Sequence, residues 1–107
     1  MVIKRFEIYW VSLNPTVGVE MQKVRPALVV SPDELNDNLG TVLIVPITSS
    51  NKKYPTRIKF KLNGKDNFIA LDQIRAVDKS RLKSKISVLG AKTSQSVCEV
   101  LQELFAY

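Results

Sequence analysis

The stretches that decide the fold are RPALVVS at residues 25–31 and TVLIVPITSS at residues 41–50. Each is a short apolar run bounded by Pro, Asp, Asn or Gly, which is typical of a buried strand, because helices usually need about ten or more residues. Each run also carries a polar residue near one end, Arg25 in the first and Thr48 in the second. If these ends are neighbours they form a phosphate site, since guanidinium makes forked hydrogen bonds to phosphate oxygens and a threonine hydroxyl can donate or accept beside it.

The segments around these two runs predict further strands. EIYWVSL at residues 7–13 is rich in aromatic and β-branched residues, which favours a first strand. RIKFKL at residues 57–62 alternates strictly, so we expect a solvated basic face and a packed apolar face. Asn63 and Gly64 predict a hairpin turn, and residues 67–72 predict the returning strand.

The C-terminal part of the chain predicts shorter elements and then a helix. Residues 74–77 continue the sheet, residues 78–82 form one helical turn, and residues 86–89 form a short apolar piece. From Thr93 the apolar residues recur at helical spacing, with Ser and Thr available as N-caps. The residues predicted to pack on the sheet are Val97, Val100, Leu101, Leu104 and Phe105. The fold class is therefore mainly β (β/α), a small barrel of strongly bent antiparallel strands with a C-terminal α-helix.

Length and composition indicate one globular domain over residues 1–107. With 45% hydrophobic and 24% charged residues, the chain resembles ordinary globular proteins and can bury one core. No apolar stretch reaches the roughly 18 residues that span a bilayer, and the N-terminus lacks a signal-peptide pattern. We therefore expect a cytoplasmic protein that makes no contact with a membrane.

The chain is basic, with 16 Lys and Arg against 10 Asp and Glu, for a net charge of +6. Five of the six excess positive charges lie in residues 54–107. Such an uneven distribution favours a polyanionic partner, through long-range attraction and counterion release. Charge alone leaves a merely solvated basic face as an equal alternative.

Several kinds of chemistry lack the residues that they need. The chain has no histidine, no phosphate-binding glycine loop and no cluster of Cys or carboxylates with metal-ligand spacing, and Cys98 is its single cysteine. We expect Cys98 to be a small apolar residue on a helix, and we expect no cofactor. An enzyme of this composition needs a substrate that supplies its own reactivity. RNA is such a substrate, because its 2′-hydroxyl lies beside the phosphodiester, and the product is a 2′,3′-cyclic phosphate with a 5′-hydroxyl.

Four blocks of the sequence carry a resemblance to a known family. They are YWVSLNPTVGVEMQKVRPALVVS at residues 9–31, TVLIVPITSS at 41–50, YPTRIKF at 54–60 and IALDQIRAVDKSRL at 69–82. In this order they resemble the MazF/PemK family of toxin endoribonucleases. The resemblance implies a small SH3-like barrel, a homodimer, and sequence-specific, ribosome-independent cleavage of single-stranded RNA without metal. It also implies inhibition by an acidic antitoxin.

The resemblance implies a role for each matching residue. Arg25 and Thr48 match the catalytic pair, with Arg25 stabilising transition-state charge and Thr48 holding the phosphate or the 2′-hydroxyl. Glu20 matches a loop glutamate that accepts a proton or a hydrogen bond from a base edge. The other expected substrate contacts are Gln22, Lys23, Ser49, Ser50 and Gln73. Because guanidinium stays protonated near neutral pH, Arg25 is a poor general base.

Two positions depart from the usual family pattern. Phe6 stands where a glycine commonly precedes the first strand, and Ser12 replaces a frequent acidic residue. Neither belongs to the expected catalytic pair.

Two other functions compete with RNA cleavage at the level of sequence. Gyrase-poisoning toxins share the implied fold, but they depend on a Trp-Gly-Ile tail, whereas this chain ends Leu-Phe-Ala-Tyr. The second is a non-catalytic RNA-binding barrel, which the basic second half alone supports. The RNA sequence that is recognised does not follow from these residues, because base specificity depends on loop geometry.

Overall fold

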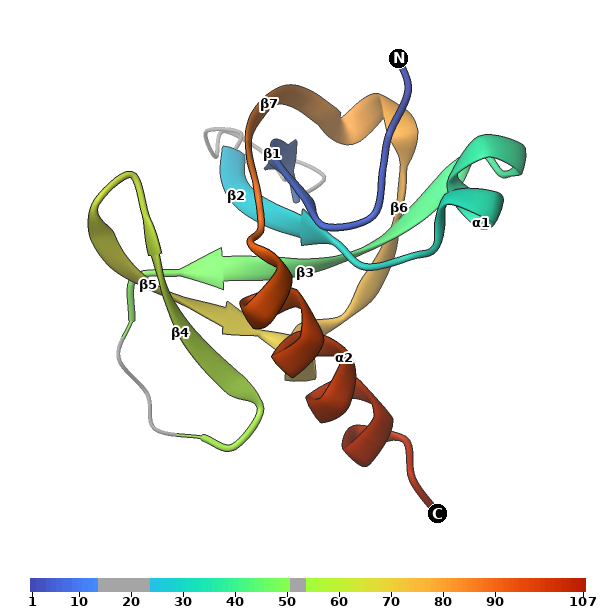
Figure 1. Ribbon diagram of the computed structural model, residues 1–107. Helices are drawn as coiled ribbons and strands as arrows, with labels where there is room; N and C mark the ends of the chain where they lie inside the picture. The colour runs from blue at the N-terminus through green and yellow to red at the C-terminus, as the bar shows by residue number, and fades with distance from the viewer. Residues whose placement is uncertain (14–23, 51–53) are drawn as a thin grey trace, which may run out of the picture.

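The computed structural model describes residues 1–13, 24–50 and 54–107. Its strands are β1 (Glu7–Ser12), β2 (Val24–Val29), β3 (Thr41–Thr48), β4 (Arg57–Leu62), β5 (Lys65–Ala70), β6 (Arg75–Asp78) and β7 (Leu82–Val88). Its helices are α1 (Asp33–Asn38), α2 (Ala91–Leu104) and the short 3-10 helices η1 (Leu71–Gln73) and η2 (Lys79–Arg81). Figure 1 shows a strongly curled sheet with α2 lying against it. The mainly β, bent antiparallel fold with a C-terminal helix is thus confirmed.

Strand β3 is the centre of the sheet, whose strand order is β4-β5-β3-β2-β1-β7 with β6 also paired to β3. On one side β3 pairs with β2. On its other side it pairs first with β6, over Thr41–Ile44, and then with β5, at Ile47 and Thr48. Pro46 falls between these two partners, so its missing N–H removes no hydrogen bond on that side.

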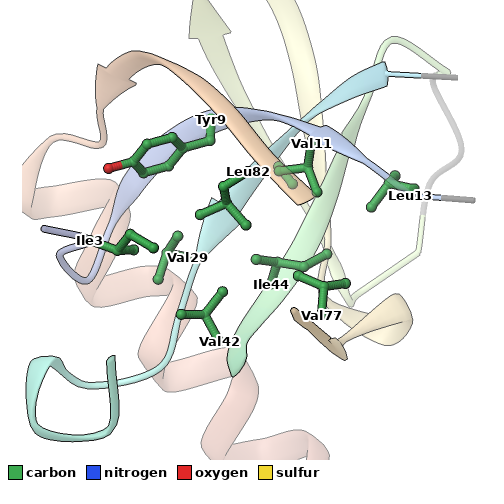
Figure 2. Packing of buried hydrophobic residues seen from close by; sticks show 10 residues of the cluster. Ile3, Tyr9, Val11, Leu13, Val29, Val42, Ile44, Val77 and Leu82 are labelled. Atoms are coloured by element: carbon green, nitrogen blue, oxygen red, sulfur yellow. The ribbon is translucent and has the colours of Figure 1, made fainter. Parts of the chain in front are cut away.

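The bend of the sheet divides the interior into two apolar clusters. Inside the curl, Tyr9, Val11 and Leu13 from the β1 segment pack with Val29 and Ile44, as Figure 2 shows. On the other face, side chains of β2, β3 and β5 pack with Val97 of α2, whose exposed fraction is zero. Alternate residues of one strand therefore supply different clusters, as a period of two requires.

Several sequence expectations hold in the structure. β4 has the bounds of the predicted run, β3 covers Thr41–Thr48 of the run at residues 41–50, and Asn63 and Gly64 form the hairpin turn with φ of 51° and 79°. The apolar residues of β4 pack against the cluster that contains Val97 of α2. Cys98 lies half-buried on α2, where Arg5 Nη2 is 3.6 Å from its Sγ.

Three expectations about the C-terminal part were wrong. The expected apolar piece at residues 86–89 is mostly the end of a longer strand, β7, which stops at Val88 and whose mostly exposed residues give no apolar alternation. Helix α2 begins after Gly90, so no Ser or Thr caps it. Leu104 and Phe105 are 39% and 69% exposed, because the cluster beneath α2 ends with Val100 and Leu101.

The chain enters β1 through a left-handed residue. Phe6 has a φ of 69°, a region that costs an L-residue about 1–2 kcal/mol. Its N–H donates to Val29 O at 2.8 Å and its carbonyl accepts from Leu89 N at 2.9 Å, so both neighbours hold this conformation. The family's usual glycine at this position therefore has a physical reason, which this chain overrides with a packed phenyl ring.

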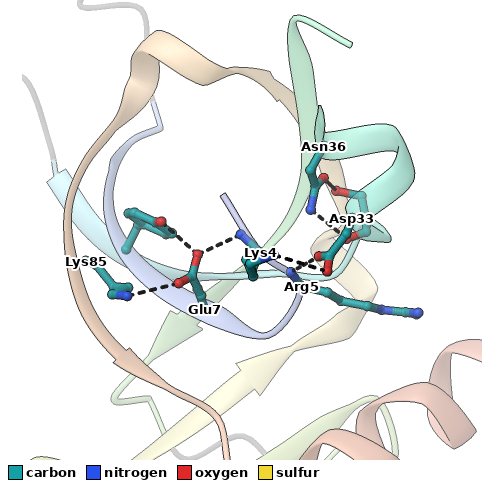
Figure 3. A network of polar contacts seen from close by, with 8 residues as sticks. Lys4, Arg5, Glu7, Asp33, Asn36 and Lys85 are labelled. Atoms are coloured by element: carbon teal, nitrogen blue, oxygen red, sulfur yellow. Dashed lines mark hydrogen bonds and ion pairs between the residues drawn. The ribbon is translucent and has the colours of Figure 1, made fainter. Parts of the chain in front are cut away.

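A polar network surrounds Glu7 at the start of β1, as Figure 3 shows. Glu7 is only 7% exposed and accepts from the Lys4 amide at 2.6 Å, from Tyr9 Oη at 2.8 Å and from Lys85 Nζ at 3.0 Å. Burial raises the pKa of Glu7, but these hydrogen bonds outweigh burial and lower the pKa overall. Burial and the Glu7 carboxylate raise the pKa of Tyr9 to about 12. No helix in the described ranges is long and apolar enough to cross a membrane.

Candidate active site

The two polar strand ends meet at one cavity of the sheet. β2 and β3 pair Ala27 with Pro46, and Arg25 and Thr48 lie two residues beyond this pair, each on its own strand. Residues opposite each other in an antiparallel pair point to the same face. Both residues line a cavity of about 390 Å³. Its described polar lining consists of Arg25, Thr48, Ser50, Arg57, Gln73 and Arg75.

Thr48 is oriented by the turn that follows β3. The Ser50 backbone N–H donates to Thr48 Oγ1 at 3.1 Å, and Thr48 also pairs with Phe68 of β5. Because the hydroxyl oxygen is already an acceptor, its own proton remains available to a ligand in the cavity. The arrangement suits donation to a phosphoryl oxygen.

Arg25 carries an uncompensated charge as far as the described residues extend. It stands opposite Val11 of β1, is exposed, and forms no ion pair with a described carboxylate. Its alternative interpretation, a strand-end arginine neutralised by a carboxylate, therefore has no support from the described residues. With respect to the described residues, the guanidinium is available to an anion in the cavity.

Arg57 lines the same cavity, contrary to the expectation of a solvated basic face on β4. Its side chain is only 8% exposed and forms a fork to Asp72, with Nε 2.9 Å from Oδ1 and Nη2 3.3 Å from Oδ2. Thr56 Oγ1 donates to the same carboxylate at 3.0 Å, and Tyr54 lies 5.7 Å from the Arg57 guanidinium. The hydrogen bond from Arg57 lowers the pKa of Asp72, and Asp72 raises the pKa of Arg57. Lys59, with a side chain 64% exposed, fits the original expectation.

Arg75 is a cavity residue that sequence reasoning missed. It lies on β6 opposite Ile44 of β3, and its Nη1 donates to Leu13 O at 2.9 Å, at the end of β1. The only sequence signal was its position two residues after Gln73 in the block IALDQIRAVDKSRL. Spacing in one strand does not reveal a contact across 62 positions.

The expected site residues divide into three groups. Arg25, Thr48, Ser50 and Gln73 come together at the cavity. Ser49 is exposed beside it and is not part of its lining. The remaining expected contacts lie outside the described residues; they are Glu20, Gln22 and Lys23.

Known proteins share both the sequence and the fold of this chain. Endoribonuclease EndoA of Bacillus subtilis is 38% identical over 95% of this chain and 93% of its own length. Endoribonuclease MazF of Staphylococcus saprophyticus is 35% identical over 89% of this chain and 84% of its own length. A MazE–MazF crystal structure from Deinococcus radiodurans superposes with a TM-score of 0.85 at 28% identity, covering 97% of this chain and 96% of that one.

The match to the family extends beyond the blocks that form the cavity. A family model described as "PemK-like, MazF-like toxin of type II toxin-antitoxin system" matches residues 4–105, which include β1, all walls of the cavity and α2. The two endoribonuclease relatives align with 95% and 89% of this chain, which is nearly the same length as the family model matches. The chain therefore belongs to the PemK-like, MazF-like toxins of type II toxin-antitoxin systems.

Proposed function

We propose that this toxin is an endoribonuclease that cuts single-stranded RNA, including mRNA, in the cavity of Arg25 and Thr48. The observation that supports it is the unbalanced charge of the cavity. Three arginines line it, and none of its described lining residues is a carboxylate. Such a lining attracts a phosphodiester, and the relatives that share these segments are named endoribonucleases.

The proposed reaction needs no metal ion, because the RNA carries its own nucleophile. The 2′-oxygen bonds to phosphorus, the bond from phosphorus to the 5′-oxygen breaks, and a 2′,3′-cyclic phosphate and a 5′-hydroxyl result. Arg25 donates hydrogen bonds to the phosphorane oxygens, which become more negative in the transition state. The Thr48 hydroxyl donates a hydrogen bond to the same oxygens, while the Ser50 backbone N–H holds the hydroxyl oxygen in place.

Two proton transfers complete the reaction. The 2′-hydroxyl loses a proton as it attacks, and the 5′-oxygen gains one as it leaves. We assign the first transfer to Glu20 or to water, since a carboxylate can accept a proton and a guanidinium near neutral pH cannot. We assign the second transfer to water, because Arg25 stays protonated and contributes hydrogen bonds rather than a proton.

The proposed partners follow the family. We propose an acidic antitoxin that neutralises the toxin, because the Deinococcus radiodurans relative was solved as a MazE–MazF complex. We also propose a homodimer, in which a small domain gains by burying apolar surface symmetrically. Sedimentation of the purified toxin at micromolar concentration tests the dimer, and a monomer only would refute it.

Cleavage of a long RNA in the presence of EDTA tests the function directly. We expect discrete cuts by the wild type, fragments that carry 2′,3′-cyclic phosphates by mass spectrometry, and a loss of about 10²–10³-fold in rate for Arg25→Ala. Lys59→Gln is the matched control, because it also removes one positive charge but from an exposed side chain outside the cavity. Equal cutting by wild type and Arg25→Ala would refute the proposal, and RNA binding without cutting would favour the non-catalytic barrel.

A further inference from the structure

The three arginines of the cavity are not equivalent. Arg57 donates from Nε and Nη2 to the two carboxylate oxygens of Asp72, so this carboxylate offsets the charge of Arg57. Arg75 bonds only to a neutral carbonyl, Leu13 O, among the described residues. Arg25 forms no ion pair with them. The excess positive charge of the cavity therefore belongs to two residues, Arg25 and Arg75.

Arg75 is held in a fixed position from both ends. Its backbone is in β6, paired with Ile44 of the central strand, and its guanidinium is tied to the end of β1 by the bond to Leu13 O. A guanidinium has five N–H donors in a rigid fork, and this bond uses one of them. Because the side chain is already ordered, a ligand that binds the remaining donors loses little rotamer entropy.

The size of the cavity leaves room for more than one phosphate. Its volume of about 390 Å³ lies in the range of small-molecule sites, about 300–1,000 Å³. Arg25 lines the cavity from β2 and Thr48 lines it from β3, whereas Arg75 reaches the cavity from β6. Arg75 also donates to the carbonyl of Leu13, which is part of the lining. Arg25 and Arg75, which have no carboxylate partner among the described residues, thus line the same cavity from different strands.

We propose that Arg75 binds a second phosphate of the RNA strand, next to the scissile phosphate held by Arg25 and Thr48. Two fixed phosphates set how the strand is placed, so Arg75 positions the scissile bond in addition to raising affinity. This inference rests on the proposed function for its substrate. The phosphate contact itself can be tested by measuring RNA affinity, without cleavage.

The chain offers a closely matched control for Arg75. Arg81 Nη1 donates to Ser12 O at 3.2 Å, so it also ties a later segment to the end of β1. Arg81 does not line the cavity. Loss of either arginine removes one charge and one hydrogen bond to the β1 end, but only Arg75→Gln removes a guanidinium from the cavity.

The experiment measures binding of a fully 2′-O-methylated RNA, which lacks the nucleophile and cannot be cut. Affinities from fluorescence anisotropy between about 50 and 200 mM salt give the slope of log K against log salt. We expect Arg75→Gln to weaken binding about tenfold and to reduce the slope by about 0.7, the value for one phosphate of a single strand. Arg81→Gln should keep the wild-type slope, and Arg75→Lys should restore most of it as a point charge.

Cleavage kinetics on unmodified RNA supply the second measurement. We expect Arg75→Gln to raise KM and also to lower kcat, by a smaller factor than Arg25→Ala, which acts mainly on kcat. Equal slopes for Arg75→Gln and wild type, or equal losses for the Gln variants of Arg75 and Arg81, would overturn the inference while cleavage by wild type still supported the function. A reduced slope with no cleavage by wild type would support the phosphate contact and refute the function. Salt-independent binding by wild type would overturn the inference, and absent binding together with absent cleavage would refute both.

Discussion

The network around Glu7 and the arginine cavity are both polar regions of one sheet, but their charges are arranged in opposite ways. Glu7 is a nearly buried carboxylate whose two oxygens accept from three donors, one of them a lysine. The cavity gathers three arginines and no described carboxylate in its lining. A polar cluster that stabilises the fold is internally satisfied, whereas a cluster that waits for a ligand keeps unsatisfied charge.

The largest expected effect separates the two regions by activity. Arg25→Gln should reduce the cleavage rate by about 10²–10³-fold while the free energy of unfolding changes by less than about 0.5 kcal/mol. The reason is that Arg25 is exposed and forms no ion pair with a described residue. Urea denaturation and an RNA cleavage assay on the same sample measure both quantities. A large loss of stability would place Arg25 among the structural residues.

The reverse result is expected for Glu7→Gln. Replacing the carboxylate weakens three hydrogen bonds and leaves Lys85 without its partner, so the free energy of unfolding should fall by about 2 kcal/mol. Lys85 is half exposed, which keeps the loss below that of a fully buried pair. Cleavage per folded molecule should be unchanged. A slower reaction at full stability would contradict the structural role of this network.

Acid also distinguishes Glu7→Gln from the wild type. The folded-state pKa of Glu7 is below its ordinary value of about 4.3, so the stabilisation is complete above that pH and is lost as the pH falls through the folded-state pKa. Thermal melting of the wild type should therefore decline more steeply below about pH 4.5 than melting of the variant. Parallel curves would show that Glu7 titrates alike in both states.

A smaller effect is expected from Asp72→Asn, which makes Arg57 resemble Arg75. The free energy of unfolding should fall by about 1 kcal/mol, because Asp72 is partly exposed although Arg57 is covered. Binding of uncleavable RNA should become tighter and more salt-dependent, since Arg57 then becomes the third cavity arginine without a carboxylate partner among the described residues. Asp66→Asn, which removes the exposed partner of Lys59, is the control and should change neither quantity. Weaker binding by Asp72→Asn would show that the fork itself contacts RNA.

The smallest expected effect concerns the left-handed Phe6 at the entry to β1, close to the Glu7 network. Both Phe6→Ala and Phe6→Gly remove the packed ring, but only glycine relieves the strain of a positive φ. We expect the glycine variant to be more stable than the alanine variant by about 1 kcal/mol, measured by denaturation. The usual order, with alanine more stable, would mean that the backbone relaxes once the ring is removed.

Strand identity was largely predictable because the decisive runs are local patterns. β3 follows from a continuous apolar run and β4 from the alternation of basic and apolar residues, although Leu43 interrupts the burial of β3. The full length of β7 was not predicted because few of its residues are buried, although it pairs with β1 along much of its length. The exposed Phe105 was misassigned because helical periodicity indicates a face but not how far the sheet extends beneath it.

Physical reasoning predicted the site only at the strand ends that carry Arg25 and Thr48, whereas Gln73 of η1 was expected from the family resemblance. Arg25 and Thr48 are neighbours because β2 and β3 are adjacent and antiparallel, which short connecting segments favour. Arg57 and Arg75 depend on how the sheet bends, since one is covered by Asp72 and the other reaches the far end of β1. Curvature of this kind arises from packing across the whole chain and leaves no mark in a local sequence pattern.

The cavity is built from segments that are distant along the chain, which has a consequence for incomplete copies of the toxin. Its lining begins at Leu13 and ends at Arg75, and the partner of β1 beyond it, β7, begins at Leu82. A nascent or proteolysed chain that stops before β6 lacks Arg75, which forms one wall of the cavity. It also lacks two contacts that hold β1, the Arg75–Leu13 hydrogen bond and the pairing with β7. Fragments that stop before β6 are therefore expected to be inactive, so that a cell meets the activity only after synthesis has passed β6 and β7.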